Sequence, residues 1–250
     1  MAILIKGGQQ IEKMKIASSI VAEAFELLEK EIRPGVTTKE LDTIAEEFIL
    51  SKGAVPSFKG YNGYPASICT AINEEVIHGI PGLKKLKDGD IIGIDIGAYI
   101  NGYHGDAART FPVGENVPDN AMKLIEVTKQ SFFEGVKHAK DGSHLFEISE
   151  AIEDYVTSFG FSCVRDFVGH GIGKSMHEDP QIPHYKQKKR GPKLCKGMAL
   201  AIEPMVNEGV YNVIILADGW TVITKDKKLS AHYENTVVIT DGEPLILTLR

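Results

Sequence analysis

Apolar side chains recur at helical spacing in two segments near the beginning of the chain. The first pattern covers residues 9–30, and the second begins after a break at Pro34-Gly35. Thr37 or Thr38 can cap the second segment, and Gly53 can end it. The pattern therefore predicts two helices joined by a short turn.

A second pair of helical patterns follows, and its first member covers residues 119–139. Gly142, in the break between the two, lies 107 residues after Gly35, and Gly160, at the end, lies 107 residues after Gly53. Any two amphipathic helix pairs align to some extent, but here the breaks and the terminal glycines coincide as well. We therefore interpret the pattern as an internal pseudo-twofold repeat.

Strand-like segments follow both helix pairs, and no linker or low-complexity tract divides them. This order is typical of an α+β fold with two pseudo-symmetric αβ halves, in which helices cover one side of a mainly antiparallel sheet. We expect a single domain over residues 1–250. The expected strands are Ala66–Ile72, Ile91–Tyr99, Gly102–Thr110, Phe161–Val168, Met198–Pro204, Trp220–Thr224 and Tyr233–Thr240.

Composition places the chain among soluble globular proteins, with 43% apolar and 25% charged residues. The formal net charge of −6 argues against a general DNA-binding or anionic-membrane-binding protein. The N-terminal apolar run is too short for a signal peptide, and no stretch approaches the roughly 20 apolar residues of a membrane helix. Three distant cysteines indicate reduced thiols. We expect a cytoplasmic protein.

Two carboxylates interrupt a region that should be apolar. Asn101-Gly102 lies between apolar runs, which is a strong signal for a two-residue hairpin turn. In that register Gly97 faces Asp106, and Asp95 lies diagonal to Asp106 on the same face, about 7 Å away. The carboxylates would repel each other unless a cation lies between them, and Gly97 leaves space for one. A solvated surface hairpin is the alternative.

Two further carboxylates lie at the ends of apolar strands. Glu203 follows Met198–Ile202, and Glu234 precedes the apolar run that ends at Ile239. Each alone is as often a strand-end residue as a ligand. Together with the hairpin pair they carry four negative charges, which two divalent cations would neutralise. The set therefore predicts a two-metal centre.

Three histidines lie in tight turns rich in glycine and proline. His170 lies among the glycines of Gly169–Gly173, His177 lies before Pro180, and His78 lies next to a glycine. An isolated histidine is more often structural than catalytic. Three in such turns, in a chain with the acidic set, favour a functional role.

In their order and spacing, these motifs resemble the methionine aminopeptidases of the bacterial type I class over nearly the whole chain. That resemblance implies a pita-bread fold, in which two αβ halves surround a dinuclear centre, and this agrees with the repeat. The matching motifs are Ile77–Pro81, Asp95, His104–Asp106, Gly169–Gly173, His177-Glu178, Ile202–Met205 and Tyr233–Thr236.

The resemblance implies that two divalent ions bind in the site and that a hydroxide bridging them attacks the scissile carbonyl. Glu203 would serve both as a ligand and as the general base. One imidazole among four carboxylates suits Mn²⁺, Fe²⁺, Co²⁺ or Zn²⁺, so the identity of the metal stays open. The five implied ligands are Asp95, Asp106, His170, Glu203 and Glu234.

The resemblance also implies how the substrate is held. His177 would donate a hydrogen bond to the scissile carbonyl, and His78 would contact the scissile amide nitrogen. A metal would bind the free α-amino group, which limits cleavage to the first residue. The implied activity is removal of the N-terminal methionine from nascent proteins and peptides.

An apolar pocket would select methionine, since aromatic rings and sulfur suit a thioether. Ordinary core packing is the alternative for these side chains. Relatives often carry an aromatic residue where Met176 stands and glutamine where His232 stands, so the stiffness of the pocket and the role of His232 stay open. The matching positions are Phe58, Tyr61, Tyr64, Cys69, Met176 and Trp220.

Other functions stay open as alternatives. One is a relative on the same fold that cleaves Xaa-Pro bonds, although such proteins usually carry an extra N-terminal domain. Another is a binding module without catalysis, which would be expected to have lost ligands. The basic loop Lys186–Lys196 is either a solvated loop or a transient contact with ribosomal RNA. We expect a monomer.

Overall fold

The computed structural model describes residues 2–249, and the order of its elements is that of an α+β protein. Its helices are α1 (Gly8–Glu31), α2 (Thr38–Ser51), α3 (Asp119–Val136) and α4 (Leu145–Ser158), with a 3₁₀ turn, η1, at Tyr61–Gly63. Its strands are β1 (Val55–Pro56), β2 (Ile68–Ile72), β3 (Glu75–Ile77), β4 (Ile91–Ile100), β5 (Tyr103–Pro112), β6 (Ser162–Cys163), β7 (Gly169–Gly171), β8 (Glu178–Ile182), β9 (Ala199–Ile202), β10 (Met205–Asn207), β11 (Val213–Ile215), β12 (Val222–Thr224), β13 (Ser230–His232), β14 (Glu234–Val238) and β15 (Leu245–Ile246).

Nine strands form one sheet, whose main path runs β1-β4-β5-β14-β9-β7-β8; β2 also pairs with β4, and β15 with β14. Two smaller sheets, β13-β10-β6 and β11-β12-β3, complete the β structure of the described residues. Every pairing between these strands is antiparallel, as expected.

The helices begin and end close to the predicted residues. Thr37 caps α2, because its hydroxyl accepts from the N–H of Glu40 while the Glu40 carboxylate accepts from the N–H of Thr37 at 2.7 Å. Gly53 and Gly160 follow α2 and α4 and have φ angles of +72° and +82°, the left-handed conformation in which helices commonly end. Within residues 2–249, none of the helices has the length and apolar character that crossing a bilayer requires.

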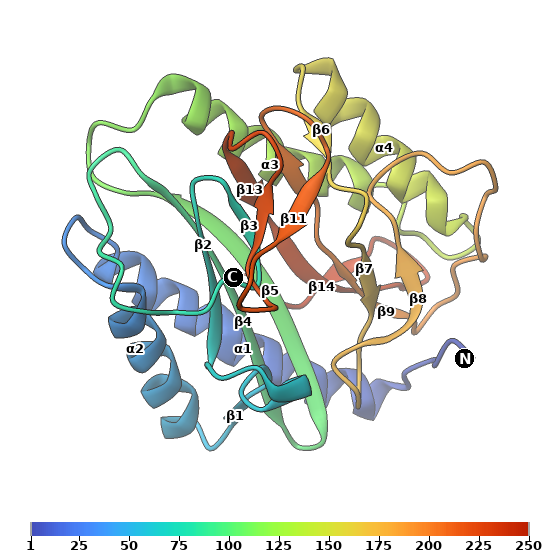
Figure 1. Cartoon of the computed structure of the whole chain (residues 1–250). Helices are drawn as coiled ribbons and strands as arrows, with labels where there is room; N and C mark the ends of the chain where they lie inside the picture. The colour runs from blue at the N-terminus through green and yellow to red at the C-terminus, as the bar shows by residue number, and fades with distance from the viewer. Residues whose placement is uncertain (1, 250) are drawn as a thin grey trace.

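Alternate residues of the central strands point to opposite faces of the large sheet. Ile92, Ile94 and Ile96 of β4 pack in a core with α1 and α2. Leu200 and Ile202 of β9 pack in a second core with α3 and α4. The paired registers place both sets on the same face, and α1 lies behind β4 and β5 in Figure 1. The helices therefore leave the other face of the sheet for the site.

Two local expectations are wrong. Of Phe161–Val168 only Ser162–Cys163 forms a strand, because β6 pairs with β10 over two residues and the chain then bends. Gly97 does not leave space for an ion, since a Cβ there would lie 2.7 Å from the Cβ of Ser57 and 2.9 Å from the ring of Phe58. The glycine instead admits the segment that carries Phe58.

Candidate active site

The β4–β5 hairpin places two carboxylates as its turn predicts. Gly97 lies opposite Asp106, and Asp95 lies opposite Ala108. Ala108 in turn lies opposite Glu234 of β14. Paired residues share a face of the sheet, and so do residues two apart. The side chains of Asp95, Asp106 and Glu234 therefore project from the same face.

The register also brings in the C-terminal strands. His170 of β7 lies opposite Ala201, which lies opposite Thr236, two residues after Glu234. His170 therefore projects from the face that carries the carboxylates. Glu203 follows β9 and lines the same pocket, so all five predicted ligands meet in one place.

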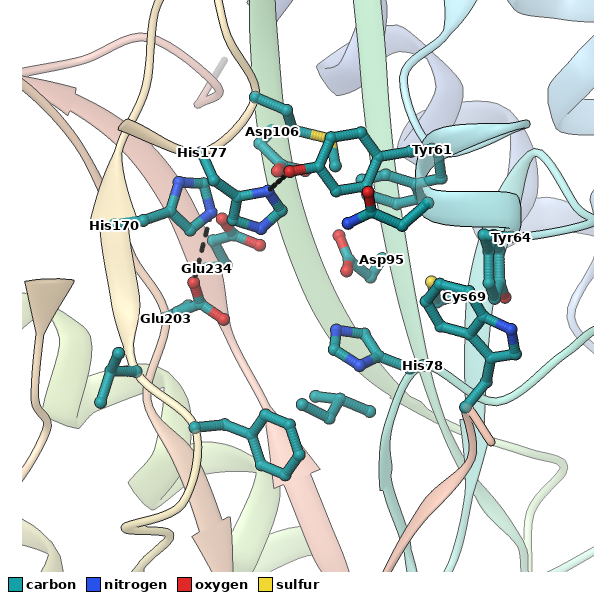
Figure 2. A pocket seen from close by; sticks show the side chains of 17 residues that line it. Tyr61, Tyr64, Cys69, His78, Asp95, Asp106, His170, His177, Glu203 and Glu234 are labelled. Atoms are coloured by element: carbon teal, nitrogen blue, oxygen red, sulfur yellow. Dashed lines mark hydrogen bonds and ion pairs between the residues drawn. The ribbon is translucent and has the colours of Figure 1, made fainter. Parts of the chain in front are cut away.

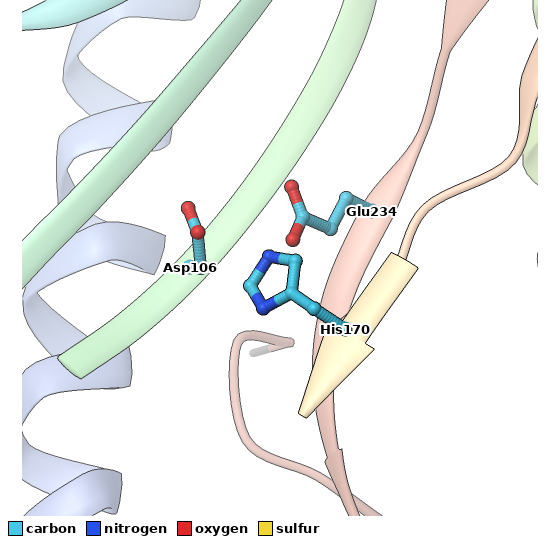
Figure 3. Close-up of side chains that lie close together, drawn as sticks. All are labelled: Asp106, His170 and Glu234. Carbon is cyan, nitrogen blue, oxygen red and sulfur yellow. The ribbon is translucent and has the colours of Figure 1, made fainter. Parts of the chain in front are cut away.

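Two groups of donor atoms are close enough to share a cation. Asp106, His170 and Glu234 come from β5, β7 and β14, and their donor atoms lie within 4.8 Å of one another (Figure 3). Glu203, His232 and Glu234 form a second group within the same limit. Glu234 belongs to both groups, which is the arrangement that a pair of neighbouring cations would need.

His170 offers a free nitrogen to this cluster. Burial, with a smaller contribution from His177, lowers the pKa of His170 to about 3, so the ring is neutral. Its Nδ1 lies 2.8 Å from the carbonyl oxygen of Gly171 and must donate there, which leaves the lone pair on Nε2. Nε2 lies 3.5 Å from Oε1 of Glu203, too far for a hydrogen bond.

The environment of the buried carboxyl groups disfavours their ionised forms. Burial raises the pKa of Asp95 to about 7. Burial and then the neighbouring carboxylates, Glu234 first, raise the pKa of Asp106. The pKa values of Glu203 and Glu234 are raised in the same way, again mainly by burial. A bound cation would reverse these shifts, because it favours the charged forms.

The cluster also contains polar atoms without partners. Oδ1 of Asp95, Oδ1 of Asp106 and Oε1 of Glu234 are buried and have no hydrogen-bond partner among residues 2–249. Buried polar groups in proteins are nearly always satisfied. Carboxylate oxygens and one imidazole nitrogen are suitable donors for first-row divalent metals, so these residues fit divalent cations.

Two further histidines stand at the edge of the cluster, in the pocket drawn in Figure 2. Nδ1 of His177 lies 2.8 Å from the hydroxyl of Tyr61, and its ring centroid lies 4.2 Å from that of His170. His78 has a positive φ of 59°, and burial lowers its pKa to about 4. Burial also lowers the pKa of His177, so both rings are neutral near pH 7 and each can donate one N–H.

An apolar cluster forms the other end of the pocket. Its buried side chains pack around the half-buried Trp220, whose ring meets that of Tyr64 edge to face at 5.0 Å. The cavity has a volume of about 360 Å³. All the residues predicted for the site line it, including the apolar set Phe58, Tyr61, Tyr64, Cys69, Met176 and Trp220.

The sequence reasoning missed residues that hold the site from behind. His184 is fully buried, and its Nε2 accepts a hydrogen bond from the backbone N–H of Glu203 at 3.2 Å. Thr236 exchanges two hydrogen bonds with the backbone of Asp106, and the Arg109 guanidinium donates to the carbonyl of Glu234. Thr236 lies in the motif Tyr233–Thr236, but its contact with Asp106 was not predicted, and no motif marks His184 or Arg109, because each partner is distant in the sequence.

Comparison with known proteins shows which family the chain resembles. Residues 12–241 match the metallopeptidase family M24. A methionine aminopeptidase of Clostridium acetobutylicum is 58% identical over 248 residues, which cover 99% of both chains. The crystal structure of methionine aminopeptidase from Thermotoga maritima superposes with a TM-score of 0.97 at 44% identity and covers 100% of both chains.

Xaa-Pro peptidases share the fold at a greater distance. The Xaa-Pro dipeptidase from Bacillus anthracis has a TM-score of 0.78 at 27% identity, and the match covers 98% of this chain but 62% of that one. That protein is therefore longer than this chain.

Proposed function

Because the chain belongs to the metallopeptidase family M24, we propose that it is a methionine aminopeptidase of the bacterial type I class, which removes the N-terminal methionine from peptides and nascent proteins. The observation that carries this proposal is one pocket in which buried carboxylates and imidazoles adjoin a cluster of aromatic rings and sulfur. Such a pocket combines a hydrolytic centre with a subsite for a thioether.

The centre is proposed to hold two divalent ions, with Mn²⁺, Fe²⁺, Co²⁺ and Zn²⁺ as the candidates. When bound, the ions supply Lewis acidity and an activated water. The unpartnered carboxylate oxygens and the free Nε2 of His170 support this assignment. The proposed ligands are Asp95, Asp106, His170, Glu203 and Glu234.

Glu203 is the proposed general base, which accepts the proton of the attacking water. Its side chain is 13% exposed, so it can meet both water and substrate, and a bound cation would keep its carboxylate ionised and able to accept a proton. His177 is proposed to donate from Nε2 to the scissile carbonyl while Nδ1 accepts from the Tyr61 hydroxyl. His78 is proposed to contact the scissile amide nitrogen.

The apolar end of the pocket is proposed to select methionine. Met176 and Cys69 offer polarizable sulfur, and Trp220 and Tyr64 form two walls at a steep angle. A methylene more or less is worth only about 1–3 kcal/mol in such a pocket. We therefore expect the enzyme to reject charged first residues strongly and norleucine weakly.

A peptide assay tests the proposal. The protein is stripped with a chelator, reloaded with each divalent ion in turn and offered Met-Ala-Ser and Ala-Pro peptides. We expect metal-dependent release of methionine from Met-Ala-Ser only. Cleavage of Ala-Pro instead would indicate the Xaa-Pro specificity, and no metal uptake with no turnover would indicate a binding module.

We also propose that residues 1–250 form one catalytic domain, which acts in the cytoplasm as a monomer.

The loop Lys186–Lys196 is proposed to contact the ribosome transiently. Neutralising Lys188, Lys189 and Lys193, which make no ion pair within residues 2–249, should weaken salt-dependent ribosome binding; unchanged binding would exclude the contact. Other basic residues of the loop are already paired: Lys186 with Glu150 and Asp154, Arg190 with Glu147, and Lys196 with Asp241.

A further inference from the structure

His232, at the end of β13, is fixed beside the proposed metal centre. The residue is 4% exposed, and Thr110 holds its backbone, because the Thr110 hydroxyl accepts from the N–H of His232 and donates to its carbonyl at 2.9 Å each. Its register partner is Met205, two residues after Glu203. The imidazole is therefore presented to the site by a backbone that has little freedom to move.

The ring nitrogen that faces Glu203 has no partner. Nε2 of His232 is buried without a hydrogen-bond partner among residues 2–249. It lies 3.7 Å from Oε2 of Glu203, which is too long for a hydrogen bond. A neutral imidazole carries its proton on one nitrogen only, so with the proton on Nδ1 the unpartnered Nε2 offers a lone pair.

Glu203 thus lies between two imidazoles. His170 approaches Oε1 at 3.5 Å, and His232 approaches Oε2 at 3.7 Å. Two donors bound to one cation at about 2.0–2.2 Å, at a tetrahedral angle, would lie about 3.4 Å apart. Both separations are therefore close to those of two ligands on a shared cation.

We propose that Nε2 of His232 is a further metal donor, which acts with Glu203 and Glu234 beside Oε2 of Glu203, whereas His170 lies nearer Oε1. The donor atoms of these three residues lie within 4.8 Å of one another. Asp95 and His232 also line one small cavity of about 10 Å³, so a proposed carboxylate ligand adjoins the imidazole. This inference rests on the proposed function, because it adds one donor to the metal centre described there.

The chemical consequence is a donor set of four carboxylates and two imidazoles. Imidazole suits Fe²⁺, Zn²⁺ and other borderline metals, whereas carboxylate and water suit Mn²⁺ and Mg²⁺. A second imidazole should therefore increase the preference of the centre for Co²⁺ or Zn²⁺ over Mn²⁺.

Paramagnetic NMR of the full chain loaded with Co²⁺ tests the proposal. A coordinated imidazole that binds through Nε2 keeps an exchangeable N–H at Nδ1, whose signal is strongly shifted by the metal. We expect two such signals in the wild-type protein, one from His170 and one from His232. His232→Asn should remove one signal and lower the calorimetric affinity of one Co²⁺ site at least tenfold, since an Asn amide is too short to reach the position of Nε2.

The matched control is His78→Asn, in the same pocket but outside both donor groups, and asparagine tolerates its positive φ. It should keep both signals and both affinities. A single signal in the wild-type protein, lost in His170→Ala and unchanged in His232→Asn, would overturn the role of His232 while leaving the metal centre intact. Failure of the wild-type protein to bind Co²⁺ would instead contradict the proposed function.

Discussion

The two sides of the pocket are built in different ways. One side, called the carboxylate side here, carries Asp95 and Asp106 on the β4–β5 hairpin, where ten consecutive residue pairs from Ile91↔Pro112 to Ile100↔Tyr103 keep one register. A two-residue turn at Asn101-Gly102 joins these strands, with positive φ angles of 55° and 82°. Local turn geometry and a long ladder therefore fix this side.

The imidazole side has no such ladder. His170 lies on a three-residue strand whose pairing with β8 shifts register between Gly169 and Gly171. The loop that follows is held by distant groups, because the buried Lys6 ammonium lies 2.7 Å from the Glu178 carboxylate. The N–H of Ser175 donates to the same carboxylate at 3.2 Å.

Backbone pairing therefore holds the carboxylate side of the pocket, whereas side-chain contacts hold the imidazole side. The carboxylate side should keep its shape when a side chain is removed, because the backbone ladder stays, so the effect should fall on metal binding. The imidazole side should respond to changes far from the pocket, because its loop depends on side-chain contacts. Substitutions on the two sides should therefore give different combinations of lost activity and lost stability.

The largest loss of activity is expected from Asp106→Ala on the carboxylate side. The aspartate is 4% exposed and belongs to the first donor group. Loss of metal should reduce peptide cleavage at least about a thousandfold, whereas the metal-free fold should be no less stable, because a buried carboxyl with a raised pKa is removed. Metal analysis, the peptide assay and denaturant unfolding check both effects. Asp166→Ala, an exposed aspartate, is the control; retained metal in Asp106→Ala would contradict the assignment.

The largest loss of stability is expected from Lys6→Met on the imidazole side. The side chains of Lys6 and Glu178 are 4% and 6% exposed, and breaking a buried ion pair costs about 3–5 kcal/mol. Lys15→Met is a matched control, since its partner Glu12 is 68% exposed and surface pairs contribute about 0–1 kcal/mol. Denaturant unfolding measures both, and equal small losses would show that the N-terminal segment does not hold the loop.

The sequence predicted the carboxylate side of the pocket better than the imidazole side. The Asn101-Gly102 turn predicted the register that sets Asp95 diagonal to Asp106, because a two-residue hairpin depends only on local residues. The contacts of Lys6 with Glu178 and of His184 with Glu203 were not predicted. Their partners lie 172 and 19 residues apart, and no local pattern encodes such a meeting.

The residue types of the site were easier to predict than its packing. Carboxylates in apolar strands and histidines in glycine-rich turns stand out because burial makes them costly. The close approach of Ser57 to Gly97 could not be inferred, since it depends on how β1 pairs with β4. The functional residues could therefore be predicted from the free-energy cost of burying polar groups. The packing around them could be seen only in the three-dimensional structure.

A smaller effect, confined to chemistry, is expected from His177→Ala. Loss of one hydrogen bond to the developing oxyanion costs about 2.7–4 kcal/mol, or about 10²–10³ in kcat. Metal content should stay unchanged, because His177 belongs to neither donor group. Tyr61→Phe, which removes only the hydroxyl beside Nδ1, should cost less. Steady-state kinetics with metal analysis separate the two, and a fully active His177→Ala would remove this residue from the mechanism.

The smallest effect, a pH dependence of stability, is expected from His184→Gln. Burial lowers the pKa of His184 to about 3, against about 6.5 in the unfolded chain. Between these values the unfolded state binds more protons, so stability falls as the pH falls below 6.5, by about 2 kcal/mol at pH 5. A glutamine oxygen can accept from the N–H of Glu203 as Nε2 does, but it does not titrate. Denaturant unfolding of the chelator-treated proteins should therefore give the same free energy of unfolding for wild type and variant at pH 7.5. At pH 5 the variant should have lost about 2 kcal/mol less of this free energy than the wild type. Parallel pH profiles would show that His184 is not held neutral by the fold.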